Sequence, residues 1–219
     1  MNDRRDRLNS AERGTFDWAL AEGDVEVVAH RDIVFGRAYT QTTKIDVSFT
    51  QWLEGEAEGL FCFMGKPGSG KSTLMKYIAT NPKVDQALDS WAKGKPPIRA
   101  EHFFWILGGP VQKSREGLLR HLLHSALLSL PPCADGEDLE LAKRICGTRR
   151  LSSNFQRAWT YDELFEMLSR LTALPDAKFF FLIDALDECE PQDRLGELAD
   201  EVIRISQLPD VKLCSTWTD

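Results

Sequence analysis

A glycine-rich stretch between two apolar segments constrains the fold of this chain more than any other feature of the sequence. The preceding residues 60–64 are apolar and have the length of a buried strand, and residues 73–78 continue in a helical pattern. The stretch itself reads Gly65, Lys66, Pro67, Gly68, Ser69, Gly70, Lys71, Ser72 and Thr73. Because glycine allows backbone angles that are closed to other residues, this order predicts a strand, a tight loop and a helix in direct succession.

The glycine stretch has the composition of a triphosphate-binding loop. Dense negative charge needs many hydrogen-bond donors without side chains in the way, and the three glycines can turn successive N–H groups inward as an anion-binding nest. The following helix adds unpaired N–H groups and a partial positive charge at its N-terminus. We expect residues 65–73 to hold the nucleotide, with Lys71 contacting the outer phosphates and the Ser72 hydroxyl holding Mg²⁺.

A second set of polar residues follows an apolar strand far downstream. Residues 179–183 are apolar and lead directly into Asp184. A carboxylate at the end of such a strand lies at the edge of the sheet, where it can hold Mg²⁺ and its waters. We expect Asp184 to bind the metal and Glu188 to polarise the attacking water as general base, with Asp187 a weaker candidate for metal or water contacts. Glu190 is interpreted as part of a solvated acidic loop.

The alternation of strand and helix patterns predicts an α/β domain with a mainly parallel sheet. Strands are predicted at residues 60–64, 99–107, 178–184 and 211–216, and helices at 10–20, 71–79, 85–92, 114–130, 139–145, 160–171 and around 198–205, with unassigned strand-like pieces near Val25 and Ile33. Capping boxes, in which two residues satisfy each other's backbone N–H groups, are predicted at Ser48 with Gln51 and at Thr160 with Glu163. We divide the chain into a helical or irregular lead-in, residues 1–55, and a nucleotide-binding core, residues 56–219.

Composition excludes several other classes of function. The net charge of -7 argues against nucleic-acid binding, which depends on clustered Lys and Arg. The five cysteines are an odd number without a Cys-x-x-Cys pair, and they are interpreted as reduced thiols of a cytoplasmic protein. No apolar run approaches 18 residues, so no membrane span is expected. His121 and His124 lie three residues apart on a predicted helix and are interpreted as solvated surface, because no third metal ligand is indicated.

These motifs together resemble the NACHT class of STAND signal-transduction NTPases. The resemblance rests on the glycine loop with its helix to Lys76, on residues 102–105 with 112–114, and on residues 181–188. It is similar in particular to fungal proteins with a nephrocystin-3-like N-terminal NTPase region, over about residues 9–214. The resemblance implies a P-loop NTPase three-layer sandwich and a switch that binds ATP, possibly GTP, with Mg²⁺ and that associates with itself or with protein partners. It places the Walker A lysine on Lys71, the Walker B metal aspartate on Asp184 and the catalytic acid on Glu188.

Two departures from the family pattern affect these expectations. Relatives continue the fourth strand into a segment whose arginine senses the terminal phosphate, whereas residues 215–219 contain no arginine. Relatives also continue into a fifth strand and further regions, so we expect the fold to be incomplete at the C-terminus. In the usual strand order the fifth strand flanks the glycine-loop strand, whose edge would then be open unless the Val25 or Ile33 segment covers it.

Three hypotheses for the function therefore stay open. The first is a slowly hydrolysing signalling NTPase, and the second is a module that binds nucleotide only for stability and for interactions with partners. The third is a small-molecule kinase, against which the acidic pattern at 184–188 and the lack of an arginine-rich lid favour water as the acceptor. A GTPase is less favoured, because Pro82 breaks the guanine-reading spacing near Asn81.

Overall fold

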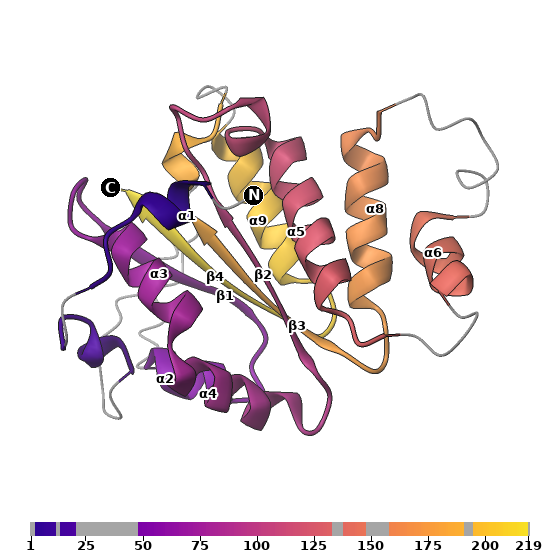
Figure 1. The fold of residues 1–219 in the computed structure, drawn as a ribbon, viewed down its shortest axis with the longest axis horizontal. Helices are drawn as coiled ribbons and strands as arrows, with labels where there is room; N and C mark the ends of the chain where they lie inside the picture. Colours follow the sequence, from indigo (N-terminus) through magenta and orange to yellow (C-terminus); the bar gives the residue numbers. More distant parts are fainter. Residues whose placement is uncertain are drawn as a thin grey trace, which may run out of the picture.

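The structure, a computed structural model, describes residues 3–11, 14–20, 48–132, 138–147, 158–190 and 195–218. Within these residues the chain forms a parallel sheet of four strands (Figure 1). The strands are β1 (Gly59–Gly65), β2 (Pro97–Phe103), β3 (Lys178–Asp184) and β4 (Val211–Thr218). Their order is β1-β4-β3-β2, so β4 separates the strand before the glycine loop from the strand that ends in Asp184. The predicted α/β fold with a mainly parallel sheet is confirmed.

Helices cover both faces of the sheet and make three layers (Figure 1). One face carries α2 (Phe49–Glu54), α3 (Lys71–Thr80) and α4 (Pro82–Ala92). The opposite face carries α5 (Arg115–Ser129), α8 (Tyr161–Thr172) and α9 (Leu195–Ser206), with α6 (Asp138–Cys146) packed against α8. The remaining described elements are the short helix α1 (Asp3–Arg7) and the 3-10 turns η1 (Asp17–Leu20), η2 (Pro110–Gln112) and η3 (Leu186–Glu188).

Strand β3 supplies the core on both faces of the sheet. Phe179, Phe181 and Ile183 are fully buried in the cluster beneath α5, α8 and α9. The alternate residues Phe180 and Leu182 belong to the cluster beneath α2, α3 and α4. Each such side chain contributes about 2 kcal/mol of burial free energy, which explains why this strand is a nearly continuous apolar run.

Both predicted capping boxes are present. The Ser48 hydroxyl accepts from the Gln51 N–H at 3.1 Å, and the Gln51 side chain accepts from the Ser48 N–H at 3.3 Å. The same exchange joins Thr160 and Glu163 at the start of α8, with distances of 3.4 and 2.9 Å. Short polar patterns thus fix where α2 and α8 begin.

Strand β2 is shorter than the sequence predicts. It ends at Phe103, which is paired with Asp184, the last residue of β3. The Phe104 N–H donates to the Asp184 carbonyl at 3.1 Å, and the chain then leaves the sheet because β3 offers no further partner. The next apolar residues form a turn in which the Gly108 N–H donates to the Trp105 carbonyl at 2.8 Å. Leu107 is consequently 80% exposed instead of buried in the sheet. We call residues 104–114 the β2–α5 loop.

The predicted helix over residues 10–20 is also wrong in its extent. A 3-10 turn covers only Asp17–Leu20, and residues 12 and 13 lie outside the described residues. Gly14 has a φ of +82°, which a continuous helix does not accommodate. Phe16 and Leu20 nevertheless pack into one apolar cluster, as the pattern indicated. The strand-like pieces near Val25 and Ile33 lie outside the described residues.

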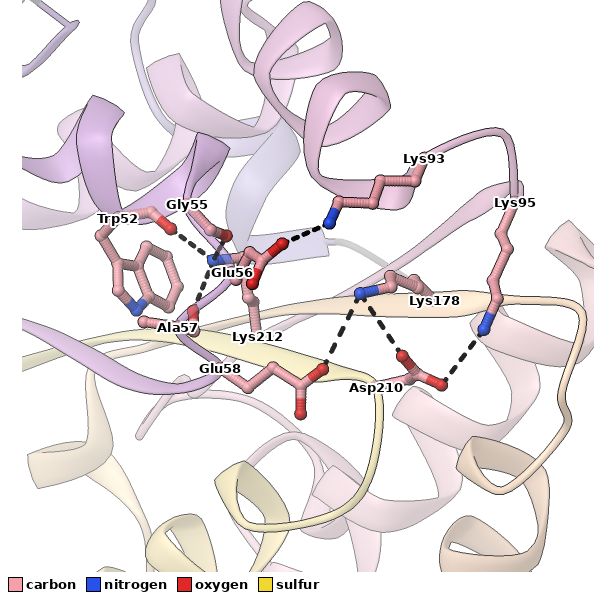
Figure 2. Close-up of polar contacts among 10 residues, drawn as sticks. All are labelled: Trp52, Gly55, Glu56, Ala57, Glu58, Lys93, Lys95, Lys178, Asp210 and Lys212. Atoms are coloured by element: carbon pink, nitrogen blue, oxygen red, sulfur yellow. Dashed lines mark hydrogen bonds and ion pairs between the residues drawn. The ribbon is translucent and has the colours of Figure 1, made fainter.

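Helix α2 is tied to the central sheet by the buried Lys212 of β4 (Figure 2). Its ammonium donates to the carbonyls of Trp52, Gly55 and Ala57, the last two at 3.0 and 2.6 Å. The same ammonium lies 4.8 Å from the centre of the Trp52 ring and 5.1 Å from that of Trp91. Burial lowers the pKa of Lys212 to about 8. Three carbonyl acceptors and two aromatic faces thus compensate for a cation inside the fold.

This contact bears on the expected division of the chain. Phe49, Trp52 and Leu53 of α2 are buried in the same cluster as β1 and α4, although the expected lead-in comprises residues 1–55. The boundary at residue 55 stays a prediction. Helix α2 packs as part of the domain's core.

Candidate nucleotide-binding site

The glycine loop connects β1 directly to α3, as predicted. Gly65 is the last residue of β1, and α3 begins at Lys71. Gly68 and Gly70 have φ values of +75° and +89°, in the left-handed region that favours glycine. A Cβ at Gly68 would meet no atom within 4 Å, so open space lies beside the loop. This backbone can bring N–H groups close to an anion without side chains intervening.

Lys71 folds back over the loop that precedes it. Its Nζ donates to the carbonyl oxygens of Gly65 and Lys66 at 2.5 and 2.9 Å. The ammonium therefore lies at the loop, where a phosphate oxygen could replace a carbonyl as its acceptor. This location agrees with the role that the sequence predicts for Lys71.

Asp184 occupies the end of β3 and is 1% exposed. Burial raises its pKa, whereas hydrogen bonds from the hydroxyls of Ser72 and Thr216 and the charge of Arg4 oppose that rise. Ser72 lies in the first turn of α3, and this helix packs against β3, the strand that ends in Asp184. The two halves of the predicted site, far apart in sequence, therefore meet.

Thr216 of β4 completes the surroundings of Asp184. Its hydroxyl donates to Asp184 Oδ1 at 2.6 Å and accepts from the Ala185 N–H at 2.9 Å. Asp184 Oδ2 is buried and has no hydrogen-bond partner among the described residues. A buried carboxylate oxygen beside a serine hydroxyl is a donor set that suits Mg²⁺. Sequence reasoning missed Thr216, because only the strand order, with β4 next to β3, places it beside Asp184.

Glu188 reaches the same edge of the sheet through a sharp turn. Ala185 has a φ of 56°, and the Glu188 N–H donates to the Ala185 carbonyl at 2.9 Å, which forms η3. Glu188 Oε2 accepts from the Ile106 N–H at 3.0 Å, and Oε1 lies 2.6 Å from Arg4 Nη2. Asp187 lies on the same turn and is partly buried.

Comparison with known proteins identifies the family. Residues 41–216 match the sequence family described as "Nephrocystin 3, N-terminal". The chain belongs to this family. No curated protein sequence gives a significant match.

Two solved structures resemble this member of the nephrocystin-3 N-terminal family at low identity. Cdc6p from Pyrobaculum aerophilum is 13% identical with a TM-score of 0.39, over 93% of this chain and 43% of that one. The cytoplasmic domain of the Thermomonospora curvata type VII secretion ATPase EccC is 11% identical with a TM-score of 0.33, over 81% of this chain and 17% of that one. The chain thus spans less than half the length of either solved chain.

Glu190 is part of a tether in this nephrocystin-3 N-terminal domain, although the sequence suggested a solvated loop. Its carboxylate lies 2.7 Å from Lys113 Nζ, and its N–H donates to the Lys113 carbonyl, also at 2.7 Å. These contacts hold the segment after η3 against the β2–α5 loop. The loop that contacts Glu188 through Ile106 is therefore fixed at both ends.

The histidine interpretation is wrong for His121 and agrees with the structure for His124. His124 is exposed. His121 instead faces the buried His102 of β2, with their Nδ1 atoms 3.1 Å apart. Burial lowers the pKa of His102 to about 3 and that of His121 to about 4, so both rings are neutral near pH 7. One ring donates a hydrogen bond to the other. The pair joins β2 to α5 and lies outside the candidate site.

Further observations limit what else these residues can do. Among the residues that the structure describes, no three His, Cys, Asp or Glu side chains are grouped so that they could hold a metal ion by themselves. A Mg²⁺ at Ser72 and Asp184 would therefore take its other ligands from water and phosphate oxygens. Within the same residues, none of the helices combines the length and the apolar character that a bilayer crossing requires.

Proposed function

We propose that this chain binds a nucleoside triphosphate, ATP in preference to GTP, and hydrolyses it slowly in the presence of Mg²⁺. The observation that carries the proposal is that α3, whose first turn holds Ser72, packs against β3, at whose end Asp184 is buried. Two segments that each suit one half of a metal–phosphate complex are thereby brought to one edge of a parallel sheet, where such sheets bind ligands. The family match over residues 41–216 is consistent with this use.

Each residue of the site has a separate task in this proposal. The backbone of residues 65–70 and the first N–H groups of α3 would surround the phosphates, and Lys71 would exchange its carbonyl acceptors for phosphate oxygens. Ser72 and Asp184 would hold Mg²⁺, which neutralises charge on the terminal phosphates when it is bound. Glu188 would orient water and accept its proton, and Asp187 is the weaker candidate for metal or water contacts.

We further propose that the nucleotide sets the association state of the chain, as in a NACHT-type switch of the STAND class. This part rests on the motif resemblance at residues 65–76, at 102–105 with 112–114, and at 181–188. We also propose a cytoplasmic location, which agrees with five cysteines that are odd in number and have no Cys-x-x-Cys pair. Analytical ultracentrifugation with ATP and with ADP would test whether the nucleotide sets the association state. An unchanged molecular mass would exclude a switch of this kind.

The binding proposal is tested by thermal unfolding with ATP, ADP, GTP and GDP, each with and without Mg²⁺. A ligand at about 100 times its dissociation constant stabilises the folded state by about 2.7 kcal/mol, which is measurable as a rise in melting temperature. We predict that Lys71→Ala abolishes this rise, because the phosphates lose their mobile cation. An unchanged rise in Lys71→Ala would refute nucleotide binding at this loop.

A second function is favoured by one observation. Both carboxylate oxygens of Glu188 are already engaged, by Arg4 and by the Ile106 N–H. A chain in that state could bind nucleotide only to stabilise an interaction surface. Phosphate release by the unmodified chain and by Glu188→Gln separates the two functions, since equal rates at background level would support the non-hydrolysing module. Phosphorylation of an added metabolite without free phosphate would instead indicate a small-molecule kinase.

A further inference from the structure

Residues 3–8, which we call the leading arm, cross the carboxyl edge of the sheet beside the candidate site (Figure 1). The arm is anchored on the β2 side, where Arg5 pairs with Glu101 and the Arg7 guanidinium lies 4.6 Å from the centre of the Trp105 ring. It is also anchored on α3, because the Leu8 carbonyl accepts from Lys76 Nζ at 2.6 Å. The arm therefore connects the β2–α5 loop with the helix that begins at the glycine loop.

Arg4 is the residue through which the arm contacts the candidate base. Its Nη2 lies 2.6 Å from Glu188 Oε1, and its Nη1 donates to the Phe104 carbonyl. The side chains of Arg4 and Glu188 are only 15% and 24% exposed, so solvent screens this ion pair incompletely. The other oxygen, Oε2, accepts from the Ile106 N–H. The carboxylate is thus held from two sides, and the guanidinium is fixed by a backbone carbonyl.

We propose that Arg4 is a positioning residue that restrains Glu188, so that the leading arm keeps the site in a resting state. This inference rests on the proposed function. A general base has to present an oxygen to the attacking water, and here water would compete with a charge-assisted hydrogen bond for that oxygen. Among the described residues, removal of the guanidinium leaves Glu188 with the Ile106 N–H, a neutral backbone donor, from which it can turn to water more easily.

The same arrangement indicates how nucleotide would relieve the restraint. Arg4 contacts Glu188 on the turn that directly follows β3, at the same edge of the sheet as the glycine loop. A triphosphate in the glycine loop would add several negative charges within reach of the same guanidinium. Phosphate and Glu188 would then compete for Arg4, which couples occupation of the loop to release of the base.

The test compares steady-state phosphate release from Mg²⁺-ATP by the full chain and its variants. We expect Arg4→Ala to raise kcat about fivefold with a smaller change in KM. The variant loses the partly buried ion pair with Glu188, so the activation barrier of hydrolysis no longer includes the cost of breaking that pair. Arg4→Lys keeps the charge and should stay near the unmodified rate. Arg170→Ala removes an arginine that pairs with Glu166 on α8, away from the site, and is the matched control. Arg4→Ala combined with Glu188→Gln should be as slow as Glu188→Gln alone, which a merely structural role of Arg4 would not require.

Equal or lower kcat in Arg4→Ala, with an unchanged melting temperature, would overturn the restraint. Absence of phosphate release from both the unmodified chain and Arg4→Ala would overturn it as well, since removal of a restraint should reveal activity. Failure of nucleotide binding at the glycine loop gives a different result, namely a nucleotide-induced melting shift that Lys71→Ala does not alter. Deuterium exchange at the Ile106 amide provides a second measurement. It should quicken in Arg4→Ala if the guanidinium holds Glu188 in place, and unchanged exchange would contradict the inference.

Discussion

At the residue scale, the candidate site depends on a carboxylate that the fold removes from water. The Thr216 hydroxyl both donates to Asp184 Oδ1 and accepts from the Ala185 N–H. We predict that Thr216→Val, which keeps the shape and removes the hydroxyl, lowers the free energy of unfolding by about 1–3 kcal/mol, because two buried polar groups lose their partner. It should also weaken the Mg²⁺-dependent part of the ATP stabilisation. Urea unfolding measures the first effect and thermal unfolding the second.

Thr216→Ser is the matched control, because it retains the hydroxyl and loses only a methyl group. It should keep most of the stability and the full response to Mg²⁺. If the valine and serine variants behave alike, the hydroxyl is not what supports Asp184.

Sequence reasoning at this scale predicted the charged residues of the candidate site and missed the residues that contact them. Lys71, Ser72 and Asp184 can be recognised in the sequence by their residue type and by their position after a glycine or at the end of a strand pattern. Arg4 and Thr216 carry no such local signal. Arg4 matters because it folds against Glu188, more than 180 residues further along the chain. Thr216 matters because it contacts Asp184, more than 30 residues before it in the sequence. A neutral threonine at the end of a strand is common, and only the strand order places this one beside the buried carboxylate.

At the scale of elements, the β2–α5 loop depends on a close approach between its backbone and the first turn of α5. A Cβ on Gly117 would lie 2.6 Å from the carbonyl carbon of Val111 and still closer to its oxygen. We predict that Gly117→Ala displaces the loop and lowers the free energy of unfolding by about 1–3 kcal/mol. Because this loop carries Ile106, the change should also accelerate deuterium exchange at the Ile106 amide. Urea unfolding and exchange mass spectrometry measure the two effects.

Gly196 in α9 is the matched control for that substitution. Among the described residues no packing atom lies within 4 Å of a Cβ at this position, so Gly196→Ala should leave stability unchanged or raise it by about 0.5–1 kcal/mol through helix propensity. Equal changes in the free energy of unfolding at the two glycines would mean that the close approach of Val111 to α5 does not contribute to the stability of the domain.

The sequence predicted element type better than element ends. Helices α2 and α8 begin where their capping boxes indicate, because those signals are local. The apolar run 103–106 looked like a longer β2, but the Phe104 N–H donates to Asp184, the last residue of β3, and the chain turns away there. Where a strand ends is decided by the neighbouring strand's length, which the run itself does not contain.

At the scale of the whole molecule, composition and motif order predicted the layered sheet, and the boundary at residue 55 stays a prediction. The expected lead-in, residues 1–55, contains α2, whose apolar side chains share a core with β1 and α4. Lys212 donates to three carbonyls at that boundary, and a lysine in a strand pattern gives no sign of such contacts (Figure 2). The long-range contacts that make α2 part of the domain join residues about 155–160 positions apart.

The last prediction follows from this arrangement and concerns the smallest unit that folds. A chain beginning at residue 56 loses Phe49, Trp52 and Leu53, and it leaves the Lys212 ammonium without two of its three carbonyl acceptors. Removing three buried side chains costs about 2–5 kcal/mol each, which together approaches the total stability of a typical domain. We therefore expect residues 56–219 to lack a cooperative thermal transition and any melting shift with ATP, whereas residues 48–219 retain both. A cooperative transition in the shorter chain, measured by calorimetry, would show that α2 is an accessory to the nucleotide-binding core.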